Sequence, residues 1–321
     1  MVNMNRFVKI FAVCFSIVLC GGGLFYLYEN NKEVHVDDKE KQVDYRLIEK
    51  DGKEYVFNSN QIAILLLGID SSDQKSLGQS DSIDLMLLDR EDETIKFLSI
   101  SRDTMCDIRS FDASGNDLGW SKNHLALAYA YGNNPESGGM LSMEAVSKLL
   151  NGVPIINFVS ADISSLAAFQ NLVGPITLTI PDDSLSYLGI GWDKGVTITI
   201  DETNVEKYLR SRNTGAAYSN EARRQRQEAY IDAYMMKLKN LLNQNFSATV
   251  KKLGSVYGRV TTNLSINELD AYAEMILTYS LDKDSFSSIS GKEKQGVLHD
   301  EYHIDEAARD ALVLSMFYKE R

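Results

Sequence analysis

The hydrophobic positions form one long uncharged run near the start of the chain and several short runs further on. Residues 10–28 are 19 consecutive residues without a charged side chain, about the length that a helix needs to cross a ~30 Å hydrocarbon core. Residues 62–68 are continuously apolar, which is typical of a strand buried on both faces. Residues 83–88 and 94–100 predict two further strands. The pattern therefore indicates a membrane span followed by a domain with a buried sheet.

The connections between these three strands are short, so consecutive strands should be antiparallel neighbours. The first and third strands then end at the same edge of the sheet. Asp70 follows the first strand, Asp81 precedes the second, and Arg102 follows the third. We therefore expect these three side chains to lie together at one edge.

Helices and strands alternate through the rest of the chain. The periodicity predicts strands over 55–57, 154–160 and 175–180, and helices over 142–150, 163–172, 202–210, 221–242, 266–279 and 304–318. Asp201 is the expected N-cap of the helix over 202–210. No internal repeat is visible. The chain should form one α/β domain covered by helices.

The charges on either side of the long uncharged run indicate its orientation. Arg6 and Lys9 precede the run, whereas acidic residues follow it from Glu29 onward, and positive charge favours the cytoplasmic side. A cleaved signal peptide is the competing reading, but no convincing small-residue cleavage site follows the run. We expect four parts: residues 1–9 in the cytoplasm, 10–28 as a transmembrane helix, 29–58 as a juxtamembrane linker and 59–321 as an extracytoplasmic domain.

Composition narrows the classes of function. The chain of 321 residues has 45 acidic and 33 basic side chains and a formal net charge of −12, which argues against nonspecific nucleic-acid binding. Cys14 and Cys20 lie in the expected anchor, so Cys106 is the only thiol of the exported part. That part therefore has no internal disulfide and no cysteine-based metal site. Any anionic ligand must be bound by a local cluster of positive charge.

Such a cluster occurs between residues 210 and 226, where Glu221 is the only acidic residue. It contains five arginines: Arg210, Arg212, Arg223, Arg224 and Arg226. Guanidinium groups bind phosphate oxygens bidentately and stay charged. The alternative is that these arginines pair with surface acids in a solvated network.

The helical spacing favours phosphate binding for part of the cluster. Arg223, Arg226 and Gln227 share one helix face, and that face continues into an apolar stripe expected to face the core: Tyr230, Ile231, Tyr234, Leu238 and Leu241. Buried arginines are expected to need anionic partners. We therefore expect a cleft that admits a phosphate there, with Arg224 pointing elsewhere.

Asp70 and Asp81 allow more than one interpretation. They could be turn residues in a loop rich in Ser, Gly and Asp. Beside arginines they could instead bind a hard cation such as Mg²⁺ together with phosphates. One of them could also act as a general base on an attacking hydroxyl.

Several blocks resemble, in order, those of the LytR-CpsA-Psr family. They are ILLLGIDSSD (64–73), GQSDSIDLMLL (78–88), FLSISRDTMCDI (97–108), KNHLALAYAYGN (122–133), VGPITLTIPDD (173–183), VEKYLRSR (205–212) and RRQRQ (223–227), with further similarity at 260–269 and 296–304. The resemblance implies an α/β fold: a single domain with a central mixed β-sheet flanked by helices, preceded by one transmembrane helix.

The resemblance also implies an activity. Members of the family are extracytoplasmic phosphotransferases that move a glycopolymer, such as a teichoic acid or capsular polysaccharide, from a polyprenyl pyrophosphate carrier to peptidoglycan. Asp70 and Asp81 match carboxylates linked to Mg²⁺ (or Mn²⁺) and to acceptor activation. The residues that match pyrophosphate-binding positions are Arg102, Lys122, Arg210, Arg212, Arg223 and Gln227, and the shared helix face adds Arg226.

The chain departs from the family pattern at a few positions. Gln79 and Ser101 stand where the family usually has Arg and Pro, and Glu228 replaces a second glutamine. The change at Gln79 leaves room for weaker activity or a different substrate. The rival readings are a non-catalytic protein that binds lipid-linked glycans, a pyrophosphatase, and a transcriptional regulator, which the outward topology and the acidic charge oppose.

Overall fold

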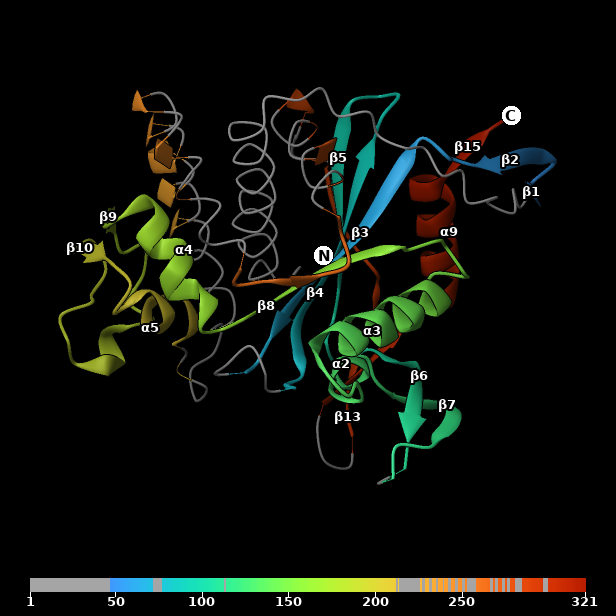
Figure 1. Cartoon of the computed structure of the whole chain (residues 1–321), viewed down its shortest axis with the longest axis horizontal. Helices are drawn as coiled ribbons and strands as arrows, with labels where there is room; N and C mark the ends of the chain where they lie inside the picture. The colour runs from blue at the N-terminus through green and yellow to red at the C-terminus, as the bar shows by residue number, and fades with distance from the viewer. Residues whose placement is uncertain are drawn as a thin grey trace.

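The centre of the fold is a mixed β-sheet (Figure 1). A computed structural model of the chain describes residues 47–71, 77–112, 114–211 and 213 and, with gaps, residues 226–321. Six of the described strands form the sheet in the order β11-β8-β3-β4-β5-β12. Their bounds are β3 Gln61–Ile69, β4 Ser80–Asp89, β5 Thr94–Ile100, β8 Asn157–Asp162, β11 Thr261–Thr262 and β12 Phe286–Ser288.

The strand directions confirm the arrangement predicted from the short connections. β3 pairs antiparallel with β4, and β4 pairs antiparallel with β5. β8 lies parallel to β3 on its other side, so these two strands end at the same edge, with Ile69 opposite Asp162. This edge carries the candidate site.

Helices cover both faces of the sheet. Successive side chains of the central strand point to opposite faces, and because both sets are apolar, each face needs a covering layer. Ile64 and Leu66 belong to one core and Leu65 and Leu67 to the other, and all four are 0% exposed. Figure 1 shows α4 and α5 on one side of the sheet and α3 and α9 on the other. The bounds are α4 Ser165–Val173, α5 Val205–Arg210, α3 Pro135–Leu149 and α9 Glu306–Phe317.

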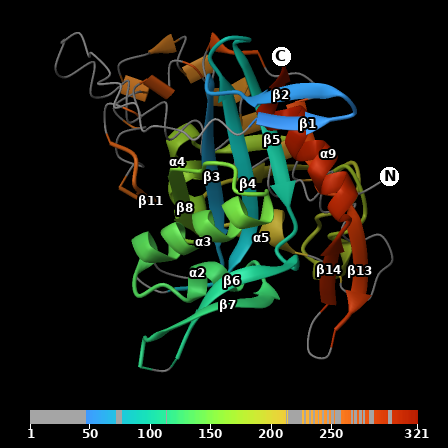
Figure 2. The ribbon, with the colours of Figure 1, turned by 90° about the vertical axis from the view of Figure 1, so that its right-hand side faces the viewer.

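Smaller elements surround these three layers. β1 (Leu47–Lys50) and β2 (Lys53–Phe57) form a hairpin that pairs with β15 (Tyr318–Glu320), so both ends of the described chain meet in one small sheet. Figure 2 shows this sheet at the level of the upper part of the six-stranded one, and the β6–β7 hairpin below the central strands. The remaining elements are β6 Met105–Phe111, β7 Asp117–His124, α2 Leu127–Ala130, β9 Ile176–Thr179, the 3₁₀ helix η1 Ser186–Leu188, β10 Thr197–Ile200, β13 Gly291–Gln295 and β14 Asp300–Ile304.

Two predicted helix starts were wrong. α3 begins at Pro135 and not at Ser142, because Asn134 and Ser137 form a capping box there. α5 begins at Val205 with Asn204 as its N-cap. The carboxylate of Asp201 accepts hydrogen bonds from Thr203 instead and so closes the preceding turn.

Two other predictions fall partly or wholly outside the described residues. The helix predicted over 221–242 is described in part: the described residues between Arg226 and Leu241 are helical, in agreement with the prediction. Within the described residues no helix has the length and hydropathy of a membrane span. The span predicted over 10–28 lies outside them.

A glycine in α3 tests the packing of this helix on the sheet. A Cβ atom on Gly139 would overlap the ring of Phe158, which is 0% exposed on β8. We expect Gly139→Ala to lower the free energy of unfolding by about 1–3 kcal/mol through overpacking, although alanine favours a helix over glycine by up to about 1 kcal/mol. Urea denaturation would measure it.

Gly258→Ala is the matched control, because a Cβ atom there meets no atom within 4 Å. Unchanged or raised stability of the Gly139→Ala variant would contradict the described packing of α3.

Candidate functional site

Two carboxylates and two arginines meet at the edge where β3 ends. Asp81, at the start of β4, accepts a hydrogen bond from Nη1 of Arg102, which follows β5. Oδ1 of Asp70, just after β3, lies 3.3 Å from Nη2 of Arg210, the last residue of α5. The structure thus brings together Asp70, Asp81 and Arg102, which were predicted to meet at this edge. It adds Arg210 from the end of α5.

The backbone at this edge fixes where the carboxylates lie. The amide of Asp70 donates to the carbonyl of Gln79 at 2.9 Å, which continues the β3–β4 pairing past the end of β3. A Cβ atom on Gly78 would overlap the carbonyl of Asp70. Only glycine allows this close approach, so Gly78 determines the position of Asp70.

Asp81 has a perturbed pKa. Burial raises the pKa of its carboxyl above the usual value of 3.8, and the nearby charge of Asp70 raises it further, whereas Arg102 and Arg210 oppose both effects. The Asp81 side chain is 31% exposed. Ionising both carboxylates at this half-buried edge thus costs free energy, and the two arginines offset only part of that cost.

A small pocket opens between these groups and the end of β8. Its lining combines charged residues (Asp70, Asp81, Asp162 and Arg210) with apolar ones (Gly68, Ile69, Ala161, Ile163 and Leu166). The cavity of about 30 Å³ has room for about one water molecule. It therefore offers charged and apolar groups for contact at its mouth, and not a cavity of the size of a ligand.

Asp162 is a site residue that the sequence did not single out. Asp162 ends β8 and lines the pocket; its Oδ1 accepts from the hydroxyl of Ser164 and the amide of Ser165 at the start of α4. It follows the strand predicted over 154–160, but that position did not reveal that β8 pairs in parallel with β3 and ends at the same edge. Gln79 accepts a hydrogen bond from Nη2 of Arg102 at 2.7 Å. Its oxygen therefore holds Arg102 and adds no positive charge.

Lys122 lies on the β6–β7 hairpin and not within this cluster. It is exposed on β7, opposite Asp107 on β6. In the described part of the chain, no ion pair joins Lys122 to Asp70 or Asp81. Arg212, Arg223 and Gln227 lie outside the described residues, so their predicted roles stay predictions.

Arg226 requires a correction. The predicted stripe is confirmed, since Arg226, Tyr230, Tyr234 and Leu238 are all buried. However, Arg226 is 0% exposed and donates to the carbonyls of Tyr208 and Ser211 at 3.1 and 2.6 Å. The prediction that it binds pyrophosphate was wrong because the partners of this buried arginine are backbone carbonyls and not an anionic ligand.

The two carboxylates at the edge fit a magnesium site that is completed by substrate phosphates and water. No group of three or more potential metal-binding side chains occurs within the described residues. Mg²⁺ commonly uses only one or two carboxylates together with substrate phosphates and water. Asp70 and Asp81, which line one pocket, fit that pattern.

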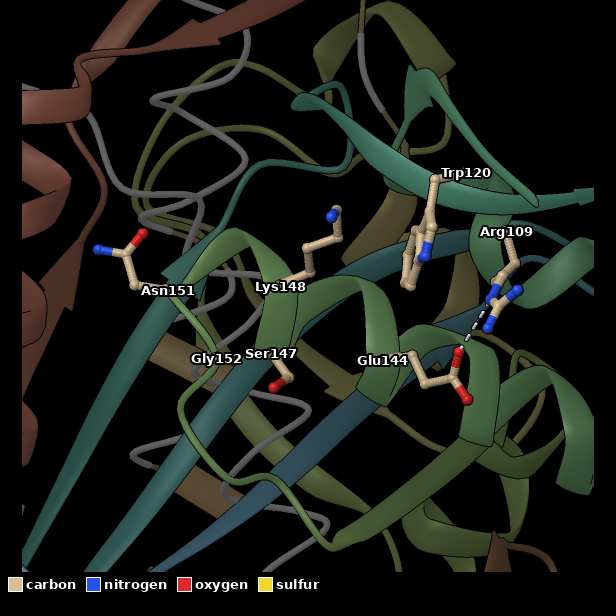
Figure 3. A pocket seen from close by; sticks show the side chains of 7 residues that line it. All are labelled: Arg109, Trp120, Glu144, Ser147, Lys148, Asn151 and Gly152. Atoms are coloured by element: carbon tan, nitrogen blue, oxygen red, sulfur yellow. Dashed lines mark ion pairs between the residues drawn. The ribbon is translucent and has the colours of Figure 1, made fainter. Parts of the chain in front are cut away.

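A second pocket lies between α3 and the β6–β7 hairpin (Figure 3). Trp120 lies between Arg109 and Lys148, with the two cations 5.0 and 4.9 Å from its ring centroid. Arg109 pairs with Asp117 at 2.7 Å and Glu144 at 3.5 Å, and Lys148 lies 3.6 Å from Asp107. Carboxylates thus face both cations here, as they do at the sheet edge.

The fold and the charged edge define an α/β protein with a candidate site for an anionic ligand, and comparison with known proteins identifies the family. The model of the LytR_cpsA_psr family matches residues 24–313. The chain belongs to this family.

Relatives and solved structures agree with this assignment. The chain is 24% identical over 303 residues to the polyisoprenyl-teichoic acid–peptidoglycan teichoic acid transferase TagV of Bacillus subtilis, covering 90% of this chain and 71% of the relative. It is 26% identical over 255 residues to TagT of the same organism, covering 74% and 72%.

Among solved structures, TagT bound to LI-WTA superposes with a TM-score of 0.56 at 21% identity, covering 88% of this chain and 97% of that one. The protein gbs0355 from Streptococcus agalactiae superposes with a TM-score of 0.59 at 21% identity, covering 79% and 86%. The central mixed sheet with its flanking helices is therefore the fold of this family.

The titration of Asp81 tests the electrostatics of the edge. Since its pKa is raised in the folded state, the folded protein protonates Asp81 at a higher pH than the unfolded chain does. The ionised carboxylate thus costs stability above that pKa, and the cost is relieved as the pH falls through it. We expect NMR of the carboxyl carbon to show titration above pH 3.8.

Two substitutions should shift the pKa of Asp81 in opposite directions. Asp70→Asn removes a neighbouring negative charge and should lower the pKa of Asp81, whereas Arg210→Ala removes a positive charge and should raise it. Titration of Asp81 at or below 3.8, or shifts of the reverse sign, would contradict this description of the edge.

Proposed function

We propose that this protein is a membrane-anchored phosphotransferase that moves a glycopolymer from a polyprenyl pyrophosphate carrier to peptidoglycan. The observation that carries the proposal is the pair of carboxylate–arginine contacts at the sheet edge, beside a small pocket lined partly by apolar residues. The relatives TagV and TagT are named as transferases of polyisoprenyl-linked teichoic acid to peptidoglycan, which supports the same class of substrates here.

In the proposed reaction a hydroxyl of the acceptor attacks the phosphorus that carries the glycan. A phosphodiester bond forms, the bond to the lipid phosphate breaks, and the polyprenyl monophosphate leaves with the electron pair. Arg102 and Arg210 would stabilise the charge that develops on the phosphate oxygens. Their guanidinium groups already lie at the edge, where they would exchange carboxylate oxygens for phosphate oxygens.

Asp70 or Asp81 would accept the proton of the attacking hydroxyl. A general base is most effective when its pKa lies near the working pH, and burial moves the pKa of Asp81 in that direction. A Mg²⁺ or Mn²⁺ ion bound by the two carboxylates would supply further neutralisation of the pyrophosphate.

Apolar residues at the mouth of the pocket would contact the first part of the polyprenyl chain. They are Ile69, Ile163 and Leu166, which line the pocket together with the charged residues. A transmembrane helix over residues 10–28, with the domain on the outer face of the membrane, would keep the site near a donor embedded in the bilayer.

A non-catalytic protein that binds lipid-linked glycans is the second candidate, and one observation favours it. Where the family usually has an arginine, Gln79 presents its oxygen to Arg102. A neutral acceptor would therefore replace one positive charge beside the phosphates. This change would weaken stabilisation of the transition state more than it would weaken binding of the lipid chain through apolar contacts.

Substitution of Arg210 tests the proposed reaction. With full-length protein, a polyprenyl pyrophosphate-linked glycopolymer, peptidoglycan and Mg²⁺, we expect a phosphodiester-linked product. Arg210→Ala should lower kcat by about 10²–10³-fold, the usual loss when one charge-stabilising donor is removed. Quantifying labelled polymer on peptidoglycan measures it.

Arg109→Ala is the control, since this arginine belongs to the α3–hairpin pocket and should leave transfer unchanged. Donor binding without any product would favour the binding protein, and phosphate release to water without product would favour a pyrophosphatase.

Gln79→Arg tests the effect of the missing charge. An arginine here places a second guanidinium beside Arg102, so we expect the KM for the donor to fall by about tenfold, the effect of one charge-assisted hydrogen bond. Gln79→Glu should have the opposite effect, because it neutralises Arg102. If neither substitution changes donor KM, position 79 does not face the pyrophosphate.

A further inference from the structure

Arg226 makes contacts that suggest a role other than ligand binding. It is the largest fully buried side chain in the described part of the protein. Its Nη1 donates to the carbonyl of Tyr208 and its Nη2 to that of Ser211. These two carbonyls belong to the last turn of α5 and to its C-cap.

The last carbonyls of a helix have no partners within the helix and carry partial negative charge. α5 has only six residues, too few for a helix that is stable without tertiary contacts. The guanidinium of Arg226 satisfies two of these terminal carbonyls at once. It therefore acts as a C-terminal cap supplied from a different helix.

Arg210 lies between the two capped residues. As the last residue of α5, it donates to Asp70 at 3.3 Å and to Glu206, one turn earlier, at 2.9 Å. The position of its guanidinium thus depends on the conformation of the turn that Arg226 holds. This dependence connects a buried residue with the candidate site at the sheet edge.

The same contact also joins two points of the sequence. The chain leaves α5 at Ser211 and comes back to this place at Arg226, and the 2.6 Å hydrogen bond joins these two residues. Arg212 and Arg223, which match pyrophosphate-binding positions by resemblance, lie in the intervening sequence. The contact therefore fixes both ends of the segment that carries them.

Asp182 supplies a negative charge for this buried cation. Burial lowers the pKa of Arg226 from its usual value, and the carboxylate of Asp182 gives the largest opposing effect. Nε of Arg226 and Oδ2 of Asp182 are both buried without a hydrogen-bond partner among the described residues. A charged group in such a place is costly to disturb, because no solvent replaces its partners.

The side chains around Arg226 keep its helix in place. The guanidinium carbon lies 5.9 Å from the ring centroid of Tyr208. One and two turns further along the same helix, the hydroxyl of Tyr230 donates to Gln170 at 2.6 Å and that of Tyr234 to the carbonyl of Phe169 at 2.9 Å. α4 and α5 are thus both attached to the helix that carries Arg226.

We propose that Arg226 is a positioning residue, which caps α5 from within the core and so holds Arg210 opposite Asp70. Its consequence for phosphate binding rests on the proposed function, whereas its effect on α5 does not. This role replaces the direct contact with pyrophosphate that was predicted for it.

Hydrogen–deuterium exchange on the ligand-free, full-length protein tests the capping. Arg226→Lys keeps the charge but cannot reach two carbonyls with one planar group. We expect the amide of Ser211, which donates to Lys207 at the end of α5, to exchange at least tenfold faster, while the amides of β9 and β10 stay unchanged.

Asp182→Asn and Asp183→Asn form a matched pair of neighbouring carboxylates. Asp182→Asn removes the negative charge that opposes the cost of burying Arg226 and should speed exchange at Ser211 at least threefold. Asp183 is exposed and should show no effect. If Arg226→Lys does not yield folded protein, this pair alone decides the question.

Affinity for farnesyl pyrophosphate, measured well below the melting temperature of each variant, tests the link to the site. We expect Arg226→Lys to weaken binding at least tenfold and Asp183→Asn to leave it unchanged. Wild-type exchange at Ser211 in Arg226→Lys, or an equal rise throughout β9 and β10, would overturn the inference. If the wild-type protein does not bind the probe, the proposed function fails, and exchange at Ser211 still decides the role of Arg226.

Discussion

The arrangement depends on the balance of charge at the edge where β3 ends. Asp70 and Asp81 lie close enough for one carboxylate to raise the pKa of the other. Arg102 and Arg210 keep this half-buried edge stable by pairing with them. The same four groups would serve a pyrophosphate and a divalent cation, because the arginines can exchange carboxylate oxygens for phosphate oxygens. Because the carboxylates are only partly neutralised, such an edge would attract the divalent cation, and the cation would then favour the pyrophosphate.

The sheet and its edge could be predicted from the sequence because their determinants are local. Continuous apolar runs identify strands buried on both faces, and short connections leave antiparallel pairing as the simple solution. The bounds of β5 agree with the predicted strand, and Asp70, Asp81 and Arg102 meet as the connectivity requires. The stripe through Tyr230, Tyr234 and Leu238 was equally visible, since it depends only on helical period.

Other features depend on contacts between segments far apart in the sequence. A buried arginine indicates that partners exist, but not that they are the carbonyls of Tyr208 and Ser211, 18 and 15 residues earlier, as for Arg226. Asp162 joins the edge only because β8 pairs in parallel with β3. The start of α5 was misplaced because Asp201 closes a turn with Thr203, a role that its residue type favours as much as capping.

The most direct test of the central claim is a crystal structure of the protein with a polyprenyl pyrophosphate and Mn²⁺, in which anomalous scattering locates the metal. The account predicts the pyrophosphate beside Arg102 and Arg210, Mn²⁺ between its oxygens and the carboxylates of Asp70 and Asp81, and the lipid chain against Ile69 and Leu166. Pyrophosphate bound in the pocket of Trp120, or an edge in which the arginines keep their carboxylate partners and no metal binds, would contradict it.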